Sequence, residues 1–311
     1  MKTAWLPTRK AASGFTLVEI LVSISVLGLM MIGVAQMLNS AMSATLGGYK
    51  HMDADTQARM VLDRMAFDIA KITKRSDVDY YFKKNTGNDQ MAFYSESGGY
   101  YPSGLTSTVP ESDVSLVGYR INGSYQMERL SKALVWNGVT TATSGAAGMS
   151  STDGHSPMVF LPQTIATTWP LVEGNGADTN YQVIGEQVFR LEYCFLVQNN
   201  MTSATAAGAA TTGTVISDNP WYTTDTSING LQDVVAVIVS IAVLDPQSQA
   251  ILSSTALQTA ASQLPDDGGT IATLPSTLWK AKLLSTGLGL PKAAASQVRF
   301  YQRYCYLNHV Q

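Results

Sequence analysis

A long apolar run directly after a basic leader is the feature that most constrains this chain. Ile20–Leu38 holds nineteen residues without an ionisable group. At about 1.5 Å per residue, a helix of that length covers a hydrocarbon core of roughly 30 Å. Lys2, Arg9 and Lys10 precede the run, so the positive-inside bias predicts a cytoplasmic leader and an exported remainder. The chain is therefore expected to cross a membrane once, near its N-terminus.

A single carboxylate at the start of this run is unusual for a membrane helix. Residues 14–19 read Gly-Phe-Thr-Leu-Val-Glu, and a charge there costs a few kcal/mol on insertion scales unless it finds a partner. A secretory signal peptide is the plain alternative. Its apolar core is usually about 7–15 residues long and ends in a small-residue cut site, whereas no such site precedes Ser40–Ala44 here.

Residues 14–19 resemble the processing signal of the type IV pilin superfamily, in which a prepilin peptidase cuts between the Gly and the Phe. The resemblance implies cleavage between Gly14 and Phe15, N-methylation of Phe15, and an assembly carboxylate at Glu19. The implied partner of Glu19 is the new α-amino group of Phe15 on a neighbouring subunit. The spacing of four would put Phe15 and Glu19 on one helix face.

Looser patterns further along resemble the larger minor pseudopilins, namely the J-type component of type II secretion systems and PilW-like minor pilins. They are residues 59–69, residues 187–195 and the apolar segment that ends at Asp245. Residues 299–306 also resemble the C-termini of prepilin-type cassette proteins of Verrucomicrobia. The resemblance implies a single-pass inner-membrane protein with a periplasmic C-terminal domain, which then enters a pilus or pseudopilus. Its partners would be the prepilin peptidase, other pilin or pseudopilin subunits and inner-membrane lipid.

The sequence predicts an α+β fold in which a long N-terminal helix packs on a mainly antiparallel β-sheet. The expected parts are a leader (1–14), a helix (15–76) with its transmembrane segment at about 18–38, and an exported globular domain (77–311). Apolar residues recur every three or four positions on one face of the second half of the helix: Ala58, Val61, Leu62, Met65, Ile69 and Ile72. The i,i+4 pair Arg64–Asp68 is expected on the polar side.

After the helix, the pattern changes to that of strands and turns. Strands are expected at residues 91–94, 114–121, 125–130, 183–197, 234–244 and 298–307, with Asn122-Gly123 as a two-residue hairpin turn. Asp245-Pro246 predicts the start of a helix that reaches about Leu264, and a shorter helix at 276–285 ends at Gly287. Residues 140–152 and 202–214 are mostly Ala, Thr, Ser and Gly, and are expected to be mobile surface insertions.

The two cysteines, Cys194 and Cys305, each lie in an expected strand between aromatic residues. If the strands are neighbours in register, a disulfide would close a loop of about 110 residues and contribute about 4–5 kcal/mol in the chain-entropy model. An oxidising compartment outside the cytoplasm allows such a bond. The alternative is two separate, buried thiols, and the sequence leaves both open.

Charge and composition narrow the function classes. The 311 residues carry a formal net charge of −3, so no nucleic-acid partner is expected. The three histidines lie far apart without metal-site spacing, and neither a nucleophile elbow nor a phosphate-binding glycine loop is present. We therefore expect no enzyme, no cofactor and no metal. The acids at Asp266-Asp267-Gly268-Gly269 are interpreted as a turn, with weak Ca²⁺ binding as the alternative.

These observations predict a minor pilin or pseudopilin, a structural subunit of a type IV pilus or type II secretion pseudopilus. The alternative is a membrane-tethered exported binding module for adhesion, DNA uptake or carbohydrate that uses the same signal.

Overall fold

The computed structural model describes Gly14 and residues 16–74, 80–99, 113–133, 181–198, 214–218, 220, 231, 234–266 and 273–307. The chain divides into two compact units, residues 1–50 and 51–311. Helix α1 (Leu17–Ala70) begins in the first unit and ends in the second. The expected insertions at 140–152 and 202–213 lie outside the described residues, whereas Thr214 begins a strand.

The first unit consists of the apolar part of α1. Within the described residues, α1 is the one helix long and apolar enough to cross a membrane. Its large side chains are exposed, with Leu29 at 70% and Met37 at 75%. The hydroxyls of Ser23 and Ser25 donate to backbone oxygens one turn earlier, at 2.7 and 2.8 Å. These hydroxyls are thus satisfied within the helix itself, as a lipid environment requires.

In the second unit, α1 buries the face that its sequence predicts. Each apolar residue of the expected stripe is buried: Ala58, Val61, Leu62, Met65, Ile69 and Ile72. The helix ends at Ala70 rather than near residue 76, because the chain then pairs with a strand. Ile72 forms a β-bridge with Ser95, and the Thr73 N–H donates to the Tyr94 carbonyl at 2.9 Å.

Two antiparallel sheets replace the single sheet that was expected. The five-stranded sheet has the order β1-β2-β3-β4-β5 and the four-stranded sheet the order β7-β6-β8-β9. The strands of the first are β1 (Tyr81–Lys83), β2 (Gln90–Ser95), β3 (Ser115–Ile121), β4 (Met127–Ala133) and β5 (Gln182–Gly185). Those of the second are β6 (Val188–Gln198), β7 (Thr214–Ser217), β8 (Val234–Val243) and β9 (Arg299–Tyr306).

The expected strand 183–197 is wrong because the chain turns at Glu186 and Gln187, so that β5 joins one sheet and β6 the other. A register shift at the start of β6 also turns Phe189 away from the face that carries Leu191. The Asn122-Gly123 hairpin is likewise a longer loop, since β3 ends at Ile121 and β4 begins at Met127.

The main core lies between α1 and the two sheets. It joins Val61 and Met65 of α1 to Phe93 of the five-stranded sheet and to Tyr193 and Val239 of the four-stranded sheet. Strand β8 is central in its sheet and buried along nearly its whole length, as the sequence predicts. The α+β class with antiparallel sheets is confirmed.

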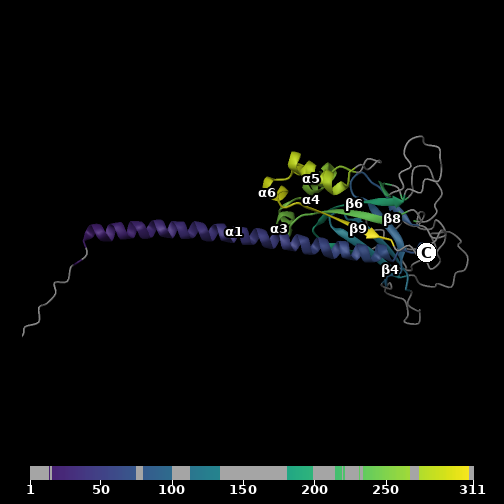
Figure 1. Ribbon diagram of the computed structural model, residues 1–311, viewed down its shortest axis with the longest axis horizontal. Coiled ribbons are helices and arrows are strands. Elements are labelled where there is room, and N and C mark those ends of the chain that lie inside the picture. The colour runs from purple at the N-terminus through teal and green to yellow at the C-terminus, as the bar shows by residue number, and fades with distance from the viewer. Residues whose placement is uncertain are drawn as a thin grey trace, which may run out of the picture. The chain divides into compact units, whose positions relative to one another are not determined.

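Short helices cover the other face of the four-stranded sheet (Figure 1). They are α3 (Pro246–Ile251), α4 (Ser254–Gln263), α5 (Pro275–Thr286), the 3-10 turn η1 (Gly287–Gly289) and α6 (Lys292–Ala295). Asp245 caps α3 as expected, but the single helix to Leu264 is wrong. The chain breaks at Leu252, and Ser253 caps α4 through its hydroxyl. The predicted helix end at Gly287 is confirmed, and the structure shows Gly287 to be a left-handed C-cap.

Candidate processing and assembly site

The start of α1 is closed by a reciprocal pair of hydrogen bonds between Thr16 and Glu19. The Thr16 backbone N–H and hydroxyl donate to Glu19 Oε2 at 3.0 and 2.9 Å, and the Glu19 N–H donates to Thr16 Oγ1 at 3.3 Å. The Thr16 carbonyl accepts the first helical bond, from Ile20. Thr16 is therefore the N-cap, and the four residues form a capping box.

This geometry places the predicted processing residues around a helix start. Gly14 is exposed and lies before the helix, Glu19 lies in the first turn, and Phe15 is outside the described residues. Because Phe15 lies outside the described residues, the helix face that it is predicted to share with Glu19 stays a prediction. Thr16 was not among the predicted site residues, although the Thr-x-x-Glu signature of a capping box is visible in the sequence.

Beyond this junction, α1 has three exposed large apolar side chains in the second unit, among exposed charged residues. Met52, Met60 and Phe67 are exposed, and their helical spacing places them opposite the buried Ala58 and Met65. Phe67 lies beside the cations of Arg64 and Lys71, whose charged groups are 5.5 and 4.3 Å from the ring centre. The second half of the stem thus has an unoccupied surface as well as a packed one.

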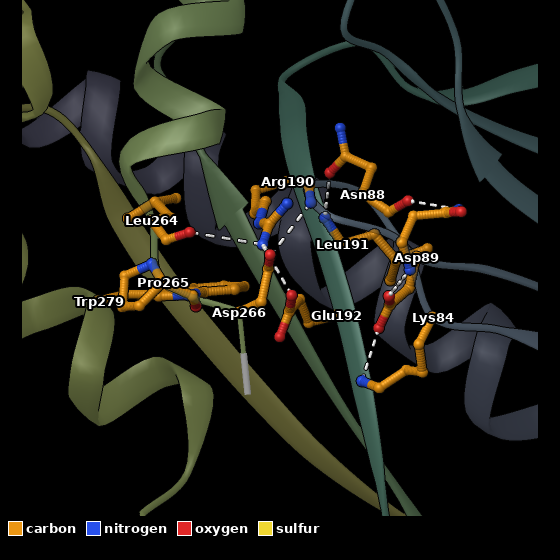
Figure 2. Close-up of polar contacts among 12 residues, drawn as sticks. Lys84, Asn88, Asp89, Arg190, Leu191, Glu192, Leu264, Pro265, Asp266 and Trp279 are labelled. Atoms are coloured by element: carbon orange, nitrogen blue, oxygen red, sulfur yellow. Dashed lines mark hydrogen bonds and ion pairs between the residues drawn. The ribbon is translucent and has the colours of Figure 1, made fainter. Parts of the chain in front are cut away.

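A loop between β1 and β2 covers the edge of β6 where β7 does not reach (Figure 2). Asn88 Oδ1 accepts from the Leu191 N–H at 2.9 Å, and Asp89 Oδ2 accepts from the Tyr193 N–H at 3.2 Å. The Asp89 N–H donates to the Leu191 carbonyl at 3.0 Å, and Lys84 Nζ to the Tyr193 carbonyl. All four outward backbone groups of these two β6 residues are satisfied.

A buried arginine ties this loop and the helical layer to β6 (Figure 2). Arg190 Nη2 donates to Glu192 Oε1 at 2.7 Å and to Asp266 Oδ1, and its guanidinium lies 5.8 Å from the ring centre of Trp279. Asp266 also accepts from the Gly87 N–H at 3.2 Å. The first acid of the Asp-Asp-Gly-Gly turn therefore serves an internal ion pair, while the other three residues lie outside the described residues.

The two cysteines sit on opposite sides of β8. Cys194 of β6 lies opposite Ile238, and Cys305 of β9 lies opposite Val237. Because Ile238 and Val237 are consecutive, the two thiols face opposite sides of the sheet. Both are buried, and no disulfide joins them in this structure. The pKa of the Cys305 thiol is raised to about 12, because the effect of burial exceeds the opposing effect of the nearby Arg303 charge.

Metal-ligating side chains do not gather in the described ranges: no group of three His, Cys, Asp or Glu could hold an ion there. His51 of α1 instead contacts the Arg299 guanidinium at 3.1 Å. His155 and His309 lie outside the described residues.

A family of known proteins matches the segment that contains the start of α1. The prokaryotic N-terminal methylation motif matches residues 9–35. This match defines the class of the N-terminal segment as a prepilin-type signal.

Type II secretion system protein J of Klebsiella pneumoniae is 30% identical over 132 residues, which are 39% of this chain and 62% of that protein. The chain thus spans less than two thirds of that curated relative. A type IV-like pilin from Thermus thermophilus is 12% identical, with 81% of this chain and 93% of that chain covered. Its TM-score of 0.28 is too low to carry an argument.

The methylation motif and the protein J relative confirm the predicted resemblance to the type IV pilin and pseudopilin superfamily. The protein J relative is named as a component of a secretion system. The motif and the apolar helix together indicate a membrane-anchored protein.

Proposed function

We propose that this chain is a minor pilin or pseudopilin of a type IV pilus or type II secretion pseudopilus. A prepilin peptidase cuts it between Gly14 and Phe15, and α1 then carries it from the inner membrane into a filament. The leader stays in the cytoplasm, and the domain after α1 is periplasmic. The protein acts as a structural subunit, and its partners are other pilin or pseudopilin subunits.

One observation carries this proposal: α1 exposes large apolar side chains along the whole first unit and at a few positions in the second. In the first unit, every large apolar side chain of the helix is exposed, including Leu21, Leu29 and Leu38. In the second unit, Met60 and Phe67 continue the exposed apolar side. Such a surface needs lipid or other helices to cover it. In a filament subunit, the helices of neighbouring subunits replace the lipid of the membrane.

The capping box supports the assembly role of Glu19. Thr16 engages Oε2, and among the described groups no hydrogen bond is made by Oε1. The Glu19 side chain is exposed at the helix start, so we expect this second oxygen to be open to solvent. It is available to the new α-amino group of a neighbouring subunit, while the first oxygen keeps the helix capped.

The test is the mature N-terminus of the full chain, expressed in cells that contain a prepilin peptidase. Intact mass and peptide sequencing should find N-methylated Phe15 in the wild type and an uncut chain in Gly14→Ala. Glu19→Gln should be cut normally and fail to enter filaments, because the neutral amide cannot form an ion pair with the α-ammonium group of a neighbouring subunit. Gly28→Ala, at a helical position with no neighbour within 4 Å, is the matched control for an added methyl group.

An uncut wild-type chain, or a cut beyond Leu38, would overturn the proposal. A normal cut with full incorporation of Glu19→Gln would remove the assembly role of Glu19 and leave the processing intact.

A further inference from the structure

The outer edge of β9 presents a row of open backbone groups. The Leu307 N–H donates to the Val235 carbonyl at 2.9 Å, and the register continues without a shift to Arg299 opposite Val243. In an antiparallel pair, alternate residues bond to the neighbour. The odd-numbered residues of β9 therefore bond to β8, and the even-numbered ones point their N–H and C=O groups outward: Phe300, Gln302, Tyr304 and Tyr306.

No described group bonds to these outward N–H and C=O groups. The contrast with β6 is direct, since Asn88, Asp89 and Lys84 satisfy every outward group of two β6 residues. Charged side chains often protect a sheet edge, but Arg299 and Arg303 of β9 turn to His51 and Asp63 of α1. Among the described residues, none pairs with the edge of β9, and neither arginine side chain protects it.

Within the described part of the chain, β7 is the other edge strand of the same sheet, and it also has outward backbone groups without a partner there. The backbone N–H groups of Leu191 and Tyr193 show that odd-numbered β6 residues direct their backbone groups toward the β7 side. Val215 and Ser217 lie opposite odd-numbered β6 residues, so their backbone groups bond to β6. Thr214 and Ile216 therefore direct their backbone groups outward, and no described group bonds to them.

The two edges have complementary directions. Along β9, Arg299, Tyr301 and Arg303 contact His51, Asp55 and Asp63 in that order, so β9 runs in the direction of α1. Because the sheet has four strands and every pairing in it is antiparallel, β7 runs opposite to α1. Two copies whose stems point the same way therefore bring β7 of one antiparallel to β9 of the other.

The side chains at the two edges also fit. The odd-numbered side chains of β9 contact α1, so Tyr304 and Tyr306 lie on the opposite face of the sheet, called here the outer face. They are 37% and 60% exposed, and their ring centres are 6.3 Å apart. Ile216 lies opposite Leu196, so it belongs to the same outer face. Aromatic and β-branched side chains are favourable cross-strand partners. With Ile216 opposite Tyr304, Thr214 lies opposite Tyr306, and the outward backbone groups of both pairs meet.

We infer that β9 is a docking edge for β7 of a second copy of this chain, so that the four-stranded sheets of neighbouring subunits join into one. The contact is heterologous, since each copy uses a different edge, and it can therefore extend along an assembly. The inference rests on the proposed function in one respect: the α1 helices of the two copies point the same way because both are anchored in the same membrane.

The test joins two full-length chains in one membrane, each with a different affinity tag. One chain carries Tyr306→Cys and the other Thr214→Cys, and mild oxidation should link them because paired strands bring Cα atoms within disulfide reach. Each variant expressed alone should give only background dimer. Ile251→Cys on α3, 75% exposed and away from both edges, replaces Tyr306→Cys in the control.

A proline variant tests the backbone contact itself. Tyr304→Pro in the chain that carries Tyr306→Cys removes one outward N–H without breaking a bond to β8. It should lower the mixed dimer by about fivefold, as expected for a lost hydrogen bond. Unchanged protease resistance of that chain would show that its fold is kept.

Absence of the mixed dimer, or linkage of Tyr306→Cys chains to one another, would overturn the inference. The mature N-terminus is measured on the same samples. A normal cut after Gly14 without mixed dimer would refute the sheet contact alone, whereas an uncut chain would refute the proposed function.

Discussion

Tyr119 donates a 2.5 Å hydrogen bond to Asp68 Oδ2, and both side chains are fully buried. Arg129 Nε binds the same oxygen at 2.7 Å, while Arg64 lies 3.5 Å away. The expected pair of Arg64 and Asp68 is present. The prediction that it lies on the polar side of the helix is wrong for Asp68, which is buried. Burial raises the pKa of Tyr119 well above its ordinary value, and the Asp68 charge adds to this. One carboxylate therefore ties the end of α1 to β3 and β4.

Removing the arginine of this cluster should be costly. Arg129→Met leaves the buried Asp68 without its nearest cation and should lower the free energy of unfolding by about 3–5 kcal/mol. Tyr119→Phe should cost about 1–3 kcal/mol, because one bond to a charged group is lost. Urea unfolding of the full chain in detergent measures both. The triple variant Asp68→Leu/Tyr119→Phe/Arg129→Met, which leaves neither the acid nor the Tyr119 hydroxyl unpaired, should recover most of the loss, and no recovery would contradict this account.

Gly185, at the end of β5, should not tolerate a side chain. A Cβ there would lie 2.9 Å from methyl groups of both Val188 and Val61 and 3.0 Å from Met127 Cβ. Gly185→Ala should therefore destabilise the second unit by about 1–3 kcal/mol through overpacking. Gly98→Ala is the matched control, since nothing lies within 4 Å of its added methyl. Equal urea midpoints for the two variants would refute the close packing of β5 on α1.

The sequence predicted what depends on local pattern. The buried stripe of α1, the central strand β8 and the Asp245 cap follow from spacing and residue type, and the structure confirms them. The contacts that join distant segments were not predictable. Nothing near Asn88 reveals that it caps an edge about a hundred positions away, and nothing near Asp68 reveals Arg129 as its partner. The turn at Glu186 and Gln187 was missed because the residues on both sides of it favour strands.

The stability contributed by Asp89 should depend on pH. Burial raises the pKa of Asp89 above its ordinary value of 3.8, although Lys84 opposes the shift. A raised pKa in the folded state contributes stability that is present at low pH and lost as the pH rises through that pKa. The unfolding free energy of wild type relative to Asp89→Asn should therefore fall as the pH is raised from about 4 to 7. A rise over this range would mean that the Lys84 ion pair outweighs burial.

Loss of the Thr16 hydroxyl should loosen the first turn of α1. Thr16→Val keeps the shape of the side chain but removes both hydroxyl bonds to Glu19, and N-cap losses cost about 1 kcal/mol. Amide hydrogen exchange of the full precursor in detergent should speed up by about fivefold at Glu19 and Ile20, whose N–H groups donate to Thr16. Thr16→Ser should exchange like the wild type. Equal exchange in all three chains would show that the capping box does not hold the helix start.

The two cysteines should remain separate thiols in the oxidising compartment. A disulfide brings Cα atoms to about 4.4–6.8 Å, whereas two strands that flank a third are about 9.5 Å apart. Cys194 and Cys305 also face opposite sides of the sheet, so a bond between them would break β8 away from both neighbours. Mass spectrometry of the purified chain should find two alkylated thiols after unfolding without reductant. Labelling of the folded chain at pH 8 should be slow, because both thiols are buried and the Cys305 pKa lies near 12. A mass lower by two hydrogens, with no alkylation, would mean that β6 and β9 are neighbours and that this sheet order is wrong.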